Sequence, residues 1–291
     1  MKQLPELFDL SGRVAVVTGG AGLLGAEFCR TLIGAGANTV IADIDEAAAK
    51  KIAASLNQPN IFPNNPMRDL PNQALPIRVD VTSKKSVENL ILRTVAEWGR
   101  LDILVNSAAL DPKFDLRGEE ATGGEDDPRS LKFEEFPLES WNQAIDVNLT
   151  GMFLCCQSAG RQMRTQGEGV IINVCSIYGL VGPDQRIYIR EEKPPQFKPA
   201  YYSVTKAGVL GLTKYLATYY AGENIRVNAL TPGGVFNNHD EEFLKAYSSR
   251  AVMGRMAEKE DMNGALLFLA SDASSYMTGS NLVVDGGWTA W

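Results

Sequence analysis

Short apolar runs alternate with segments of helical periodicity along most of the chain. Short runs of apolar, often β-branched residues predict buried strands at 13–17, 39–42, 77–82, 101–106, 170–174, 225–230 and 280–287. Apolar residues that recur every three or four positions predict helices at 26–32, 45–50, 84–98, 141–166, 202–220 and 261–269. About seven strands in alternation with helices indicate one α/β domain over 1–291, a doubly wound parallel sheet with helices on both faces.

Four polar stretches interrupt this alternation. The stretch 57–75 is rich in Pro and Asn and predicts an irregular surface excursion. The stretch 111–137 carries a Gly-Gly pair and many acids, which is typical of a flexible flap. The charged stretch 182–199 predicts a long loop, and 236–260 predicts one or two helices that could form a lid.

Composition narrows the class of protein. The chain has 291 residues, 45% of them hydrophobic, which is enough to bury a large core. A net charge of −7 argues against nucleic acid or an anionic membrane as a partner. No charged-then-apolar leader opens the chain and no apolar run is long enough to span a bilayer, so we expect a cytoplasmic protein. The four cysteines lack a C-x-x-C spacing and His239 is the only histidine, so we expect free buried thiols and no metal site.

The first predicted strand leads into a glycine turn, Thr18–Gly25, which opens a helix. Glycines let a backbone approach a pyrophosphate, and a helix N-terminus offers free N–H groups and a favourable dipole. A tight turn without a ligand is the alternative. The second strand ends at Asp43, whose carboxylate can accept hydrogen bonds from the ribose of NAD and would repel the 2′-phosphate of NADP. Asp43 could instead cap the next helix, but Asp45 is the better candidate for that role.

Tyr202 and Lys206 lie one helical turn apart and therefore share a face. A nearby ammonium lowers the pKa of a phenol, so this pair can act as a general acid–base. A Tyr and a Lys that merely share a turn are the alternative. Ser176 follows a predicted strand, where ligands bind in such sheets, and could hydrogen-bond a reacting oxygen. Asn148 lies among apolar residues, as a satisfied core amide or as an anchor for a water or for the backbone.

These residues together resemble the short-chain dehydrogenase/reductase family over nearly the whole chain. The matching segments are the Thr18–Gly25 turn, Asp80–Thr82, Asn106–Ala109, Asn148, Ser176, Tyr202 with Lys206, Asn228, Pro232–Gly233 and Asp285–Gly287. The resemblance implies a Rossmann-like domain that transfers a hydride between a nicotinamide cofactor, NAD in view of Asp43, and a carbon that bears a hydroxyl or carbonyl.

The resemblance also implies roles for individual residues. Tyr202 would donate or accept the proton, Lys206 would lower its pKa and hold the nicotinamide ribose, Ser176 would polarise the substrate oxygen, and Asn148 would anchor a water. Asn106 would lie beside the cofactor. The implied cofactor contacts are Gly19, Gly22, Leu23, Leu24, Asp43, Ile44, Asp80, Val81, Asn106, Ala108, Tyr202, Lys206, Pro232, Gly233 and Val235.

The sequence departs from the family pattern at four places, one of which is Asn106–Ala109, where the family has N-N-A-G. Leu23 stands where the family has the middle glycine of its turn, and Asn237 replaces the usual Thr after Pro-Gly. The separation of Ser176 from Tyr202 is 202 − 176 = 26 residues, about twice the usual length. The long loop edges the substrate site.

A weaker similarity to oxidoreductases of bacterial surface-sugar and flagellin modification suggests a sugar-like substrate. The candidate substrate contacts are Tyr178, Arg186, Arg190 and Phe236. Arg186, Arg190 and Lys198 could bind a phosphate or carboxylate, although solvated surface is the simpler interpretation of three basic side chains on a loop.

Three functional hypotheses follow. The leading one is an NAD-dependent oxidoreductase that acts on a small polar, sugar-like alcohol or ketone. The others are a reductase of carrier-bound 3-oxoacyl groups and a non-catalytic NAD-binding module. The helix at 202–220 has apolar residues on more than one face, which predicts a homodimer or homotetramer.

Overall fold

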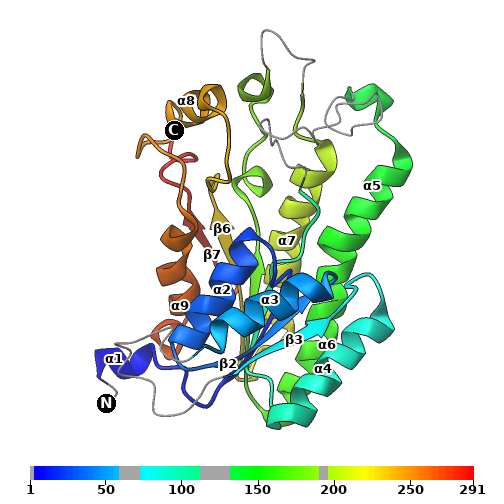
Figure 1. Ribbon diagram of the computed structural model, residues 1–291, viewed down its shortest axis with the longest axis vertical. Helices are drawn as coiled ribbons and strands as arrows, with labels where there is room; N and C mark the ends of the chain where they lie inside the picture. The colour runs from blue at the N-terminus through cyan, green and yellow to red at the C-terminus, as the bar shows by residue number, and fades with distance from the viewer. Residues whose placement is uncertain (1–2, 59–72, 112–131, 190–195) are drawn as a thin grey trace.

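One parallel sheet of seven strands runs through the molecule (Figure 1), in the order β3-β2-β1-β4-β5-β6-β7. The computed structural model describes residues 3–58, 73–111, 132–189 and 196–291. The strands are β1 (Val14–Thr18), β2 (Asn38–Asp43), β3 (Ala74–Arg78), β4 (Ile103–Asn106), β5 (Gly169–Val174), β6 (Ile225–Pro232) and β7 (Asn281–Val284). The chain reverses its direction of winding between β1 and β4, which confirms the predicted doubly wound α/β fold.

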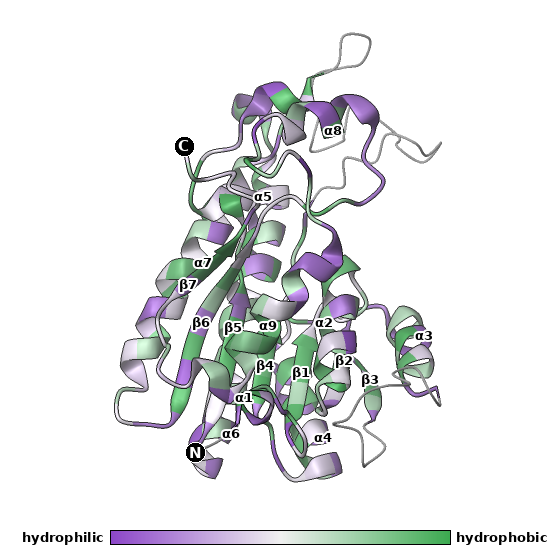
Figure 2. Cartoon of the chain, turned by 90° about the vertical axis from the view of Figure 1, so that its left-hand side faces the viewer, coloured by the Kyte–Doolittle hydropathy of each residue, from purple (hydrophilic) through white to green (hydrophobic). Residues whose placement is uncertain are grey.

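Helices cover both faces of this sheet. They are α1 (Leu4–Leu7), α2 (Leu23–Gly34), α3 (Glu46–Leu56), α4 (Lys84–Trp98), α5 (Leu138–Ile145), α6 (Met152–Gln166), α7 (Ala200–Tyr219), α8 (Glu241–Ser248) and α9 (Asn263–Ala270). The helices α2, α3 and α9 share one hydrophobic core with the sheet, and α4, α6 and α7 share the other. Hydropathy follows this layering, because the strands are mostly hydrophobic while hydrophilic residues gather on the outer helices (Figure 2).

Alternating strand residues supply the two cores. In β1, Ala15 and Val17 pack with Phe28 of α2 on one face, while Val16 packs on the other face. All five residues of β1 are buried, as expected of a central strand. Full burial of a side chain such as Phe28 is worth about 1.5–3 kcal/mol, so the central strands and the helices on them form the stable base of the site.

The third strand begins earlier than the sequence pattern predicts. The expected strand at 77–82 is instead Ala74–Arg78, and it includes Pro76 opposite Ile41. Proline lacks the N–H that a central strand needs, but β3 is an edge strand, where that N–H has no neighbour to bond. The remainder of the excursion expected at 57–75 lies mainly outside the described residues.

The helix expected at 141–166 is not uniform. It consists of α5, a π-helical segment Asp146–Gly151 and α6. Single π-helical turns inside helices are rare and occur often at functional sites. This turn contains Asn148, which is 1% exposed and points at the loop after β4.

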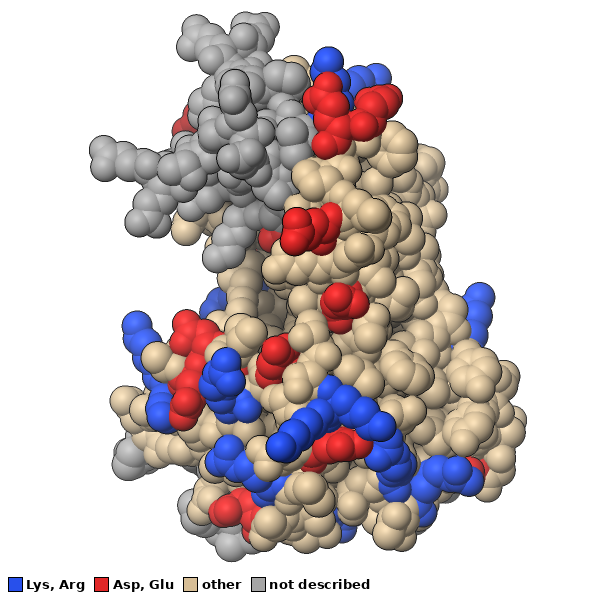
Figure 3. Space-filling model, turned by 90° about the vertical axis from the view of Figure 1, so that its right-hand side faces the viewer, with Lys and Arg blue, Asp and Glu red and all other residues tan. Residues whose placement is uncertain are grey.

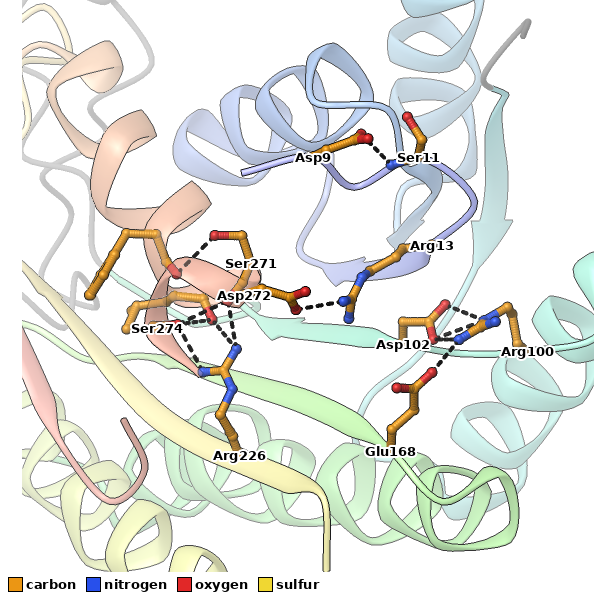
Figure 4. Close-up of polar contacts among 12 residues, drawn as sticks. Asp9, Ser11, Arg13, Arg100, Asp102, Glu168, Arg226, Ser271, Asp272 and Ser274 are labelled. Atoms are coloured by element: carbon orange, nitrogen blue, oxygen red, sulfur yellow. Dashed lines mark hydrogen bonds and ion pairs between the residues drawn. The ribbon is translucent and has the colours of Figure 1, made fainter. Parts of the chain in front are cut away.

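Charged contacts close the amino-terminal edge of the sheet (Figure 4). Arg100 joins Asp102, just before β4, to Glu168, just before β5. Arg13, just before β1, pairs with Asp272 at 2.7 Å, and Arg226 donates to Ser274 at 2.9 Å. This edge is therefore tied together by the chain itself, whereas a cavity opens at the carboxyl edge.

Candidate active site

A cavity of about 610 Å³ opens at the carboxyl ends of β1, β4, β5 and β6. This is where ligands bind in doubly wound sheets, beside the point at which the strand order reverses. The side of the cavity opposite the sheet is formed by Phe243 and Tyr247 of α8 and by His239 and Met256, which precede and follow this helix. Its lining includes Gly19, Gly22, Leu23, Leu24, Ser107, Ala109, Asp111, Ser176, Tyr178, Tyr188, Lys198, Tyr202, Lys206, Pro232, Gly233, Val235, His239, Phe243 and Tyr247.

The glycine turn forms one end of this cavity. Gly19 has a φ of +65°, and a Cβ there would lie 2.8 Å from the backbone of Ala108. A Cβ on Gly25 would lie 1.9 Å from the carbonyl oxygen of Gly19. Both positions thus require glycine, because the turn packs tightly against α2 and the end of β4. Leu23 is the first residue of α2 and is 42% exposed, so the turn accommodates its side chain without closing.

The amino-terminal end of α2 faces the cavity. Gly22 caps this helix in an extended conformation and offers no side chain to its first N–H groups. The first N–H groups of a helix have no partner within the helix, and its dipole favours an anion. Gly22, Leu23 and Leu24 line the cavity, so this end of the site fits the pyrophosphate of a dinucleotide.

Asp43 lies beside the glycine turn. One carboxylate oxygen accepts a hydrogen bond from the Ala21 N–H at 2.9 Å, and the other accepts from the Asp45 N–H at 3.0 Å. Asp45 accepts from the Ala48 N–H, which confirms that Asp45, rather than Asp43, caps α3. The remaining expected cofactor residues of this region, Ile44, Asp80 and Val81, follow β2 and β3 outside the cavity lining.

Ser176, Tyr202 and Lys206 converge on the cavity. Ser176 follows β5, while Tyr202 and Lys206 come from the first two turns of α7. The three side chains are buried, with 7%, 8% and 4% of their surface exposed. The Lys206 ammonium lies 5.7 Å from the centre of the Tyr202 ring and donates a hydrogen bond to the Val174 carbonyl at 2.9 Å.

The acidity of Tyr202 differs from the expectation. Burial raises the pKa of Tyr202 well above its usual range, and the Asp111 carboxylate raises it further, while a hydrogen bond with Ser176 acts in the opposite direction. The net direction of the shift is therefore opposite to the lowering expected from Lys206, because burial and Asp111 are its largest causes. Burial also lowers the pKa of Lys206. At neutral pH Tyr202 consequently keeps its proton, and a group that stabilises the phenolate is needed to make it an effective proton donor.

Asn148 anchors backbone rather than lining the cavity. Its side-chain oxygen accepts from the Leu110 N–H at 2.6 Å, and its amide group donates to the Leu110 carbonyl at 3.0 Å. These bonds fix the residue that precedes Asp111. Of the two roles considered for Asn148, the structure shows a backbone anchor at the edge of the site.

Asn106 does not face the cavity. Its amide group donates to the Asn173 side chain at 2.8 Å and to the Cys156 sulfur at 3.2 Å, in the interior of the sheet. The side chain of Asn106 therefore points into the sheet, since alternate residues of a strand point to opposite sides, and the expected place of Asn106 beside the cofactor stays a prediction. Ser107 and Ala109 line the cavity instead, and Ala108 packs on Gly19.

The expected substrate residues separate into three groups. Tyr178 lines the cavity, and its hydroxyl lies 2.8 Å from that of Tyr188. Arg186 has an 80% exposed side chain, pairs with Asp184 and does not line the cavity, so its contact with a substrate stays a prediction that this geometry does not support. Phe236 packs against the cluster around Tyr202 without lining the cavity, and Arg190 lies outside the described residues.

Several cavity residues were not expected from the sequence. Asp111 belongs to the insertion expected at 111–137, Tyr188 to the loop expected at 182–199, and Phe243 and Tyr247 to the lid expected at 236–260, but none of the four is an expected site residue. The spacing of Phe243 and Tyr247 on α8, one turn apart between charged residues, is the signal that could have identified an inward face. No such local signal exists for Asp111, because it meets its partner Lys198 from 87 residues away.

The described residues also relate to three expectations, which concern the cysteines, a metal site and membrane-spanning helices. All four cysteines are free and buried, which confirms the expectation of buried thiols. Within the described ranges, no cluster of His, Cys, Asp and Glu has the makeup of a metal site. None of the helices in those ranges combines the length and apolar character needed to cross a membrane.

Known protein sequences resemble this chain over nearly its whole length. A family described as enoyl-(acyl carrier protein) reductase matches residues 20–289. The cis-4-hydroxycyclohexanecarboxylate dehydrogenase of Sinomonas cyclohexanicum is 37% identical over 96% of this chain and 97% of its own length. The D-threitol dehydrogenase of Mycolicibacterium smegmatis is 30% identical over 99% of both chains.

Solved structures also resemble this chain over nearly its whole length. A short-chain dehydrogenase of Leptospira borgpetersenii with bound NAD+ superposes with a TM-score of 0.77, at 30% identity over 99% of this chain and 96% of its own. A gluconate 5-dehydrogenase of Burkholderia cenocepacia, in complex with NADP and tartrate, superposes with a TM-score of 0.78, at 29% identity over 99% of this chain and 100% of its own. Both nicotinamide cofactors thus occur among the structural neighbours.

Proposed function

This chain belongs to the short-chain dehydrogenase/reductase family, oxidoreductases that use a nicotinamide cofactor, and we propose that it is an NAD-dependent dehydrogenase of a small, polar, sugar-like alcohol. The observation that carries the proposal is the convergence of Ser176, Tyr202 and Lys206 in the cavity that begins at the glycine turn. A bound nicotinamide would supply the hydride chemistry.

The residues of this chain would hold the cofactor along the carboxyl edge of the sheet. The glycine turn and the start of α2 would bind the pyrophosphate through backbone N–H groups. Lys206, Pro232, Gly233 and Val235 line the inner part of the cavity and would hold the nicotinamide half. Asp43, with Ile44, Asp80 and Val81 further along the edge, would hold the adenosine half.

Proton transfer falls to the buried phenol. Tyr202 carries its proton in this structure and can donate it to a substrate carbonyl oxygen. Ser176 can orient the same oxygen, because its side chain lines the same cavity as that of Tyr202. Lys206, held by Val174, supplies a positive charge beside the phenol and favours the phenolate that remains after the transfer. The reverse sequence of proton movements serves oxidation of the alcohol.

Asp43 supports NAD over NADP. Its carboxylate is held beside the turn by the Ala21 and Asp45 N–H groups, so it would meet the 2′-phosphate of NADP with a like charge. The polar substrate is supported by the polar atoms of Ser176, Tyr178, Tyr202 and Lys198 in the cavity wall. The D-threitol and hydroxycyclohexanecarboxylate relatives act on small hydroxylated molecules by name.

Assembly and location are part of the same proposal. The side of α4, α5 and α6 shows a broad uncharged area beside a few scattered acidic side chains, with charges of both signs at its upper and lower ends (Figure 3). Leu92 of α4, Phe153 of α6, and Val204 and Tyr215 of α7 are exposed apolar or aromatic side chains. We propose that these helices pair in a homodimer or homotetramer. Four buried free thiols fit a reducing cytoplasm.

Replacement of Tyr202 by Phe tests the chemistry. We expect turnover to fall by about 10²–10⁴-fold with NADH binding retained, because the variant loses its transferable proton and keeps its ring. Tyr201→Phe is the matched control, since Tyr201 is adjacent and buried but does not line the cavity. Absorbance of NADH reports turnover over a panel of sugars, polyols and hydroxy acids. Full turnover by Tyr202→Phe would refute the assigned role, and absence of turnover with tight NAD binding would favour a non-catalytic module.

A further inference from the structure

The Tyr247 side chain joins helix α8 to the segment that follows β6. Tyr247 is 3% exposed and lines the cavity, and its hydroxyl accepts a hydrogen bond from the Gly234 N–H. A Cβ on Gly234 would lie 2.6 Å from the Tyr247 ring, so the ring packs directly on this backbone. A side chain from the helix opposite the sheet therefore contacts the backbone at the end of a strand.

Aromatic neighbours hold the Tyr247 ring in place. The ring of Trp288, which follows β7, stacks on it with the ring centres 4.2 Å apart. The ring of Phe243, one turn earlier on α8, lies 6.0 Å away. Burial raises the pKa of the Tyr247 phenol, so the hydroxyl is neutral at physiological pH. Tyr247 is thus a fixed, uncharged hydrogen-bond partner for the backbone.

Backbone hydrogen bonds fix the rest of the segment. The Gly233 N–H donates to the Val284 carbonyl at 2.9 Å, and the Gly234 carbonyl accepts from the Ala257 N–H at 2.9 Å. The Val235 N–H has no partner among the residues that the structure describes, and Val235 lines the cavity. The bond from α8 therefore holds the residue next to a backbone donor that a ligand can use.

The order of the strands places this segment at the nicotinamide end of a bound dinucleotide. The glycine turn follows β1, and Asp43 ends β2 on one side of β1. On the other side come β4, β5, which is followed by Ser176, and then β6. A dinucleotide with its pyrophosphate at the turn and its adenosine at Asp43 would thus extend its nicotinamide toward Ser176 and Gly233–Val235.

We infer that Tyr247 is a positioning residue for the nicotinamide: through its bond to the Gly234 N–H, it holds the Gly233–Val235 backbone in the conformation that binds this half of the cofactor. The inference rests on the proposed function, because it concerns the cofactor end of the same site. Without the hydroxyl, the Gly234 N–H has no partner in that conformation, and cofactor binding must offset the cost of restoring it. Binding of the adenosine half does not depend on Tyr247.

Two ligands that differ at the nicotinamide end test the inference. NADH carries the nicotinamide, whereas ADP-ribose lacks it and keeps the pyrophosphate and the adenosine. Calorimetry measures the Kd of each for the wild type and for Tyr247→Phe, which removes the hydroxyl and keeps the stacked ring. We expect the ratio of the ADP-ribose Kd to the NADH Kd to fall by about fivefold, the typical contribution of one hydrogen bond.

A second variant and a matched control isolate the contact. Gly234→Ala places a Cβ 2.6 Å from the Tyr247 ring, so the segment must shift, and the same ratio should fall although the hydroxyl is present. In the control, Trp291→Phe, the lost hydrogen bond is the one from the Trp291 indole to the Arg250 carbonyl at 3.0 Å. That bond anchors the chain just after α8 rather than the segment after β6, so the ratio should stay at the wild-type value.

The binding measurements need no turnover. A ratio that falls in Tyr247→Phe and in Gly234→Ala supports the inference even if no alcohol is oxidised, in which case the proposed function alone fails. Equal weakening of NADH and ADP-ribose in Tyr247→Phe would overturn the inference, because it would show a general structural role. An unchanged ratio in either variant, or an equal fall in Trp291→Phe, would overturn it as well. So would a wild type that binds NADH no more tightly than ADP-ribose.

Discussion

Replacing Asp43 with asparagine is expected to weaken the preference for NAD over NADP. Asparagine has the same shape and keeps one oxygen as a hydrogen-bond acceptor, so it can retain one of the bonds to the Ala21 and Asp45 N–H groups, of 2.9 and 3.0 Å. The charge, however, is lost. The substitution therefore tests electrostatics at the ribose site with little change in the shape of the turn.

The magnitude follows from Coulomb's law. Two like charges about 4 Å apart repel by about 1 kcal/mol in water and by about 4 kcal/mol near a protein surface. Asp43 is partly buried at the end of β2, so its value lies between these limits. Removal of the charge should change the ratio of kcat/KM for NADH to that for NADPH by between about fivefold and about 10³-fold, in favour of NADPH.

The assay is a comparison of initial rates with the two cofactors, beside a thermal melt of each variant. Asp45→Asn is the matched control, because Asp45 lies two residues away and caps α3 without contacting the glycine turn. Its cofactor ratio should stay at the wild-type value. A ratio in Asp43→Asn that stays within about twofold of the wild type, with an intact melt, would refute the role of Asp43. A wild type that prefers NADPH would refute it at once.

Two further predictions concern the turn and the core. Gly25→Ala places a Cβ 1.9 Å from the Gly19 oxygen, so the turn must shift. We expect a stability loss of about 1–3 kcal/mol in urea unfolding and weaker NADH binding in a fluorescence titration. An unchanged NADH affinity would contradict this prediction. Burial raises the pKa of the Cys156 thiol from 9.0 to about 12. The unfolded chain then ionises first, so the stability that Cys156 contributes is complete below pH 9 and is lost as the pH rises toward 12. Cys156→Ala should therefore show a shallower fall in unfolding free energy between pH 8 and 10.5 than the wild type, and equal slopes would count against it.

The sequence by itself determined the elements and the chemistry that depends on local spacing. The periodicity of apolar residues predicted each strand and most helices, because burial on one or two faces imposes a repeat that can be read along the chain. Tyr202 and Lys206 share a face because they lie four residues apart on α7. In the Thr18–Gly25 turn, Gly19 and Gly25 occupy positions where close packing leaves no room for a Cβ.

Only the tertiary structure decided how distant residues meet at the site. Asp111 and Lys198 are separated by 87 residues and come from two polar stretches whose patterns carry no period, so their pairing could not be read from either one. The raised pKa of Tyr202 could not be predicted from the sequence for a similar reason, because its largest causes are burial and Asp111 rather than the lysine one turn away. Spacing along a helix fixes which side chains share a face, but the charges and the exclusion of water that set their reactivity come from segments folded over that face.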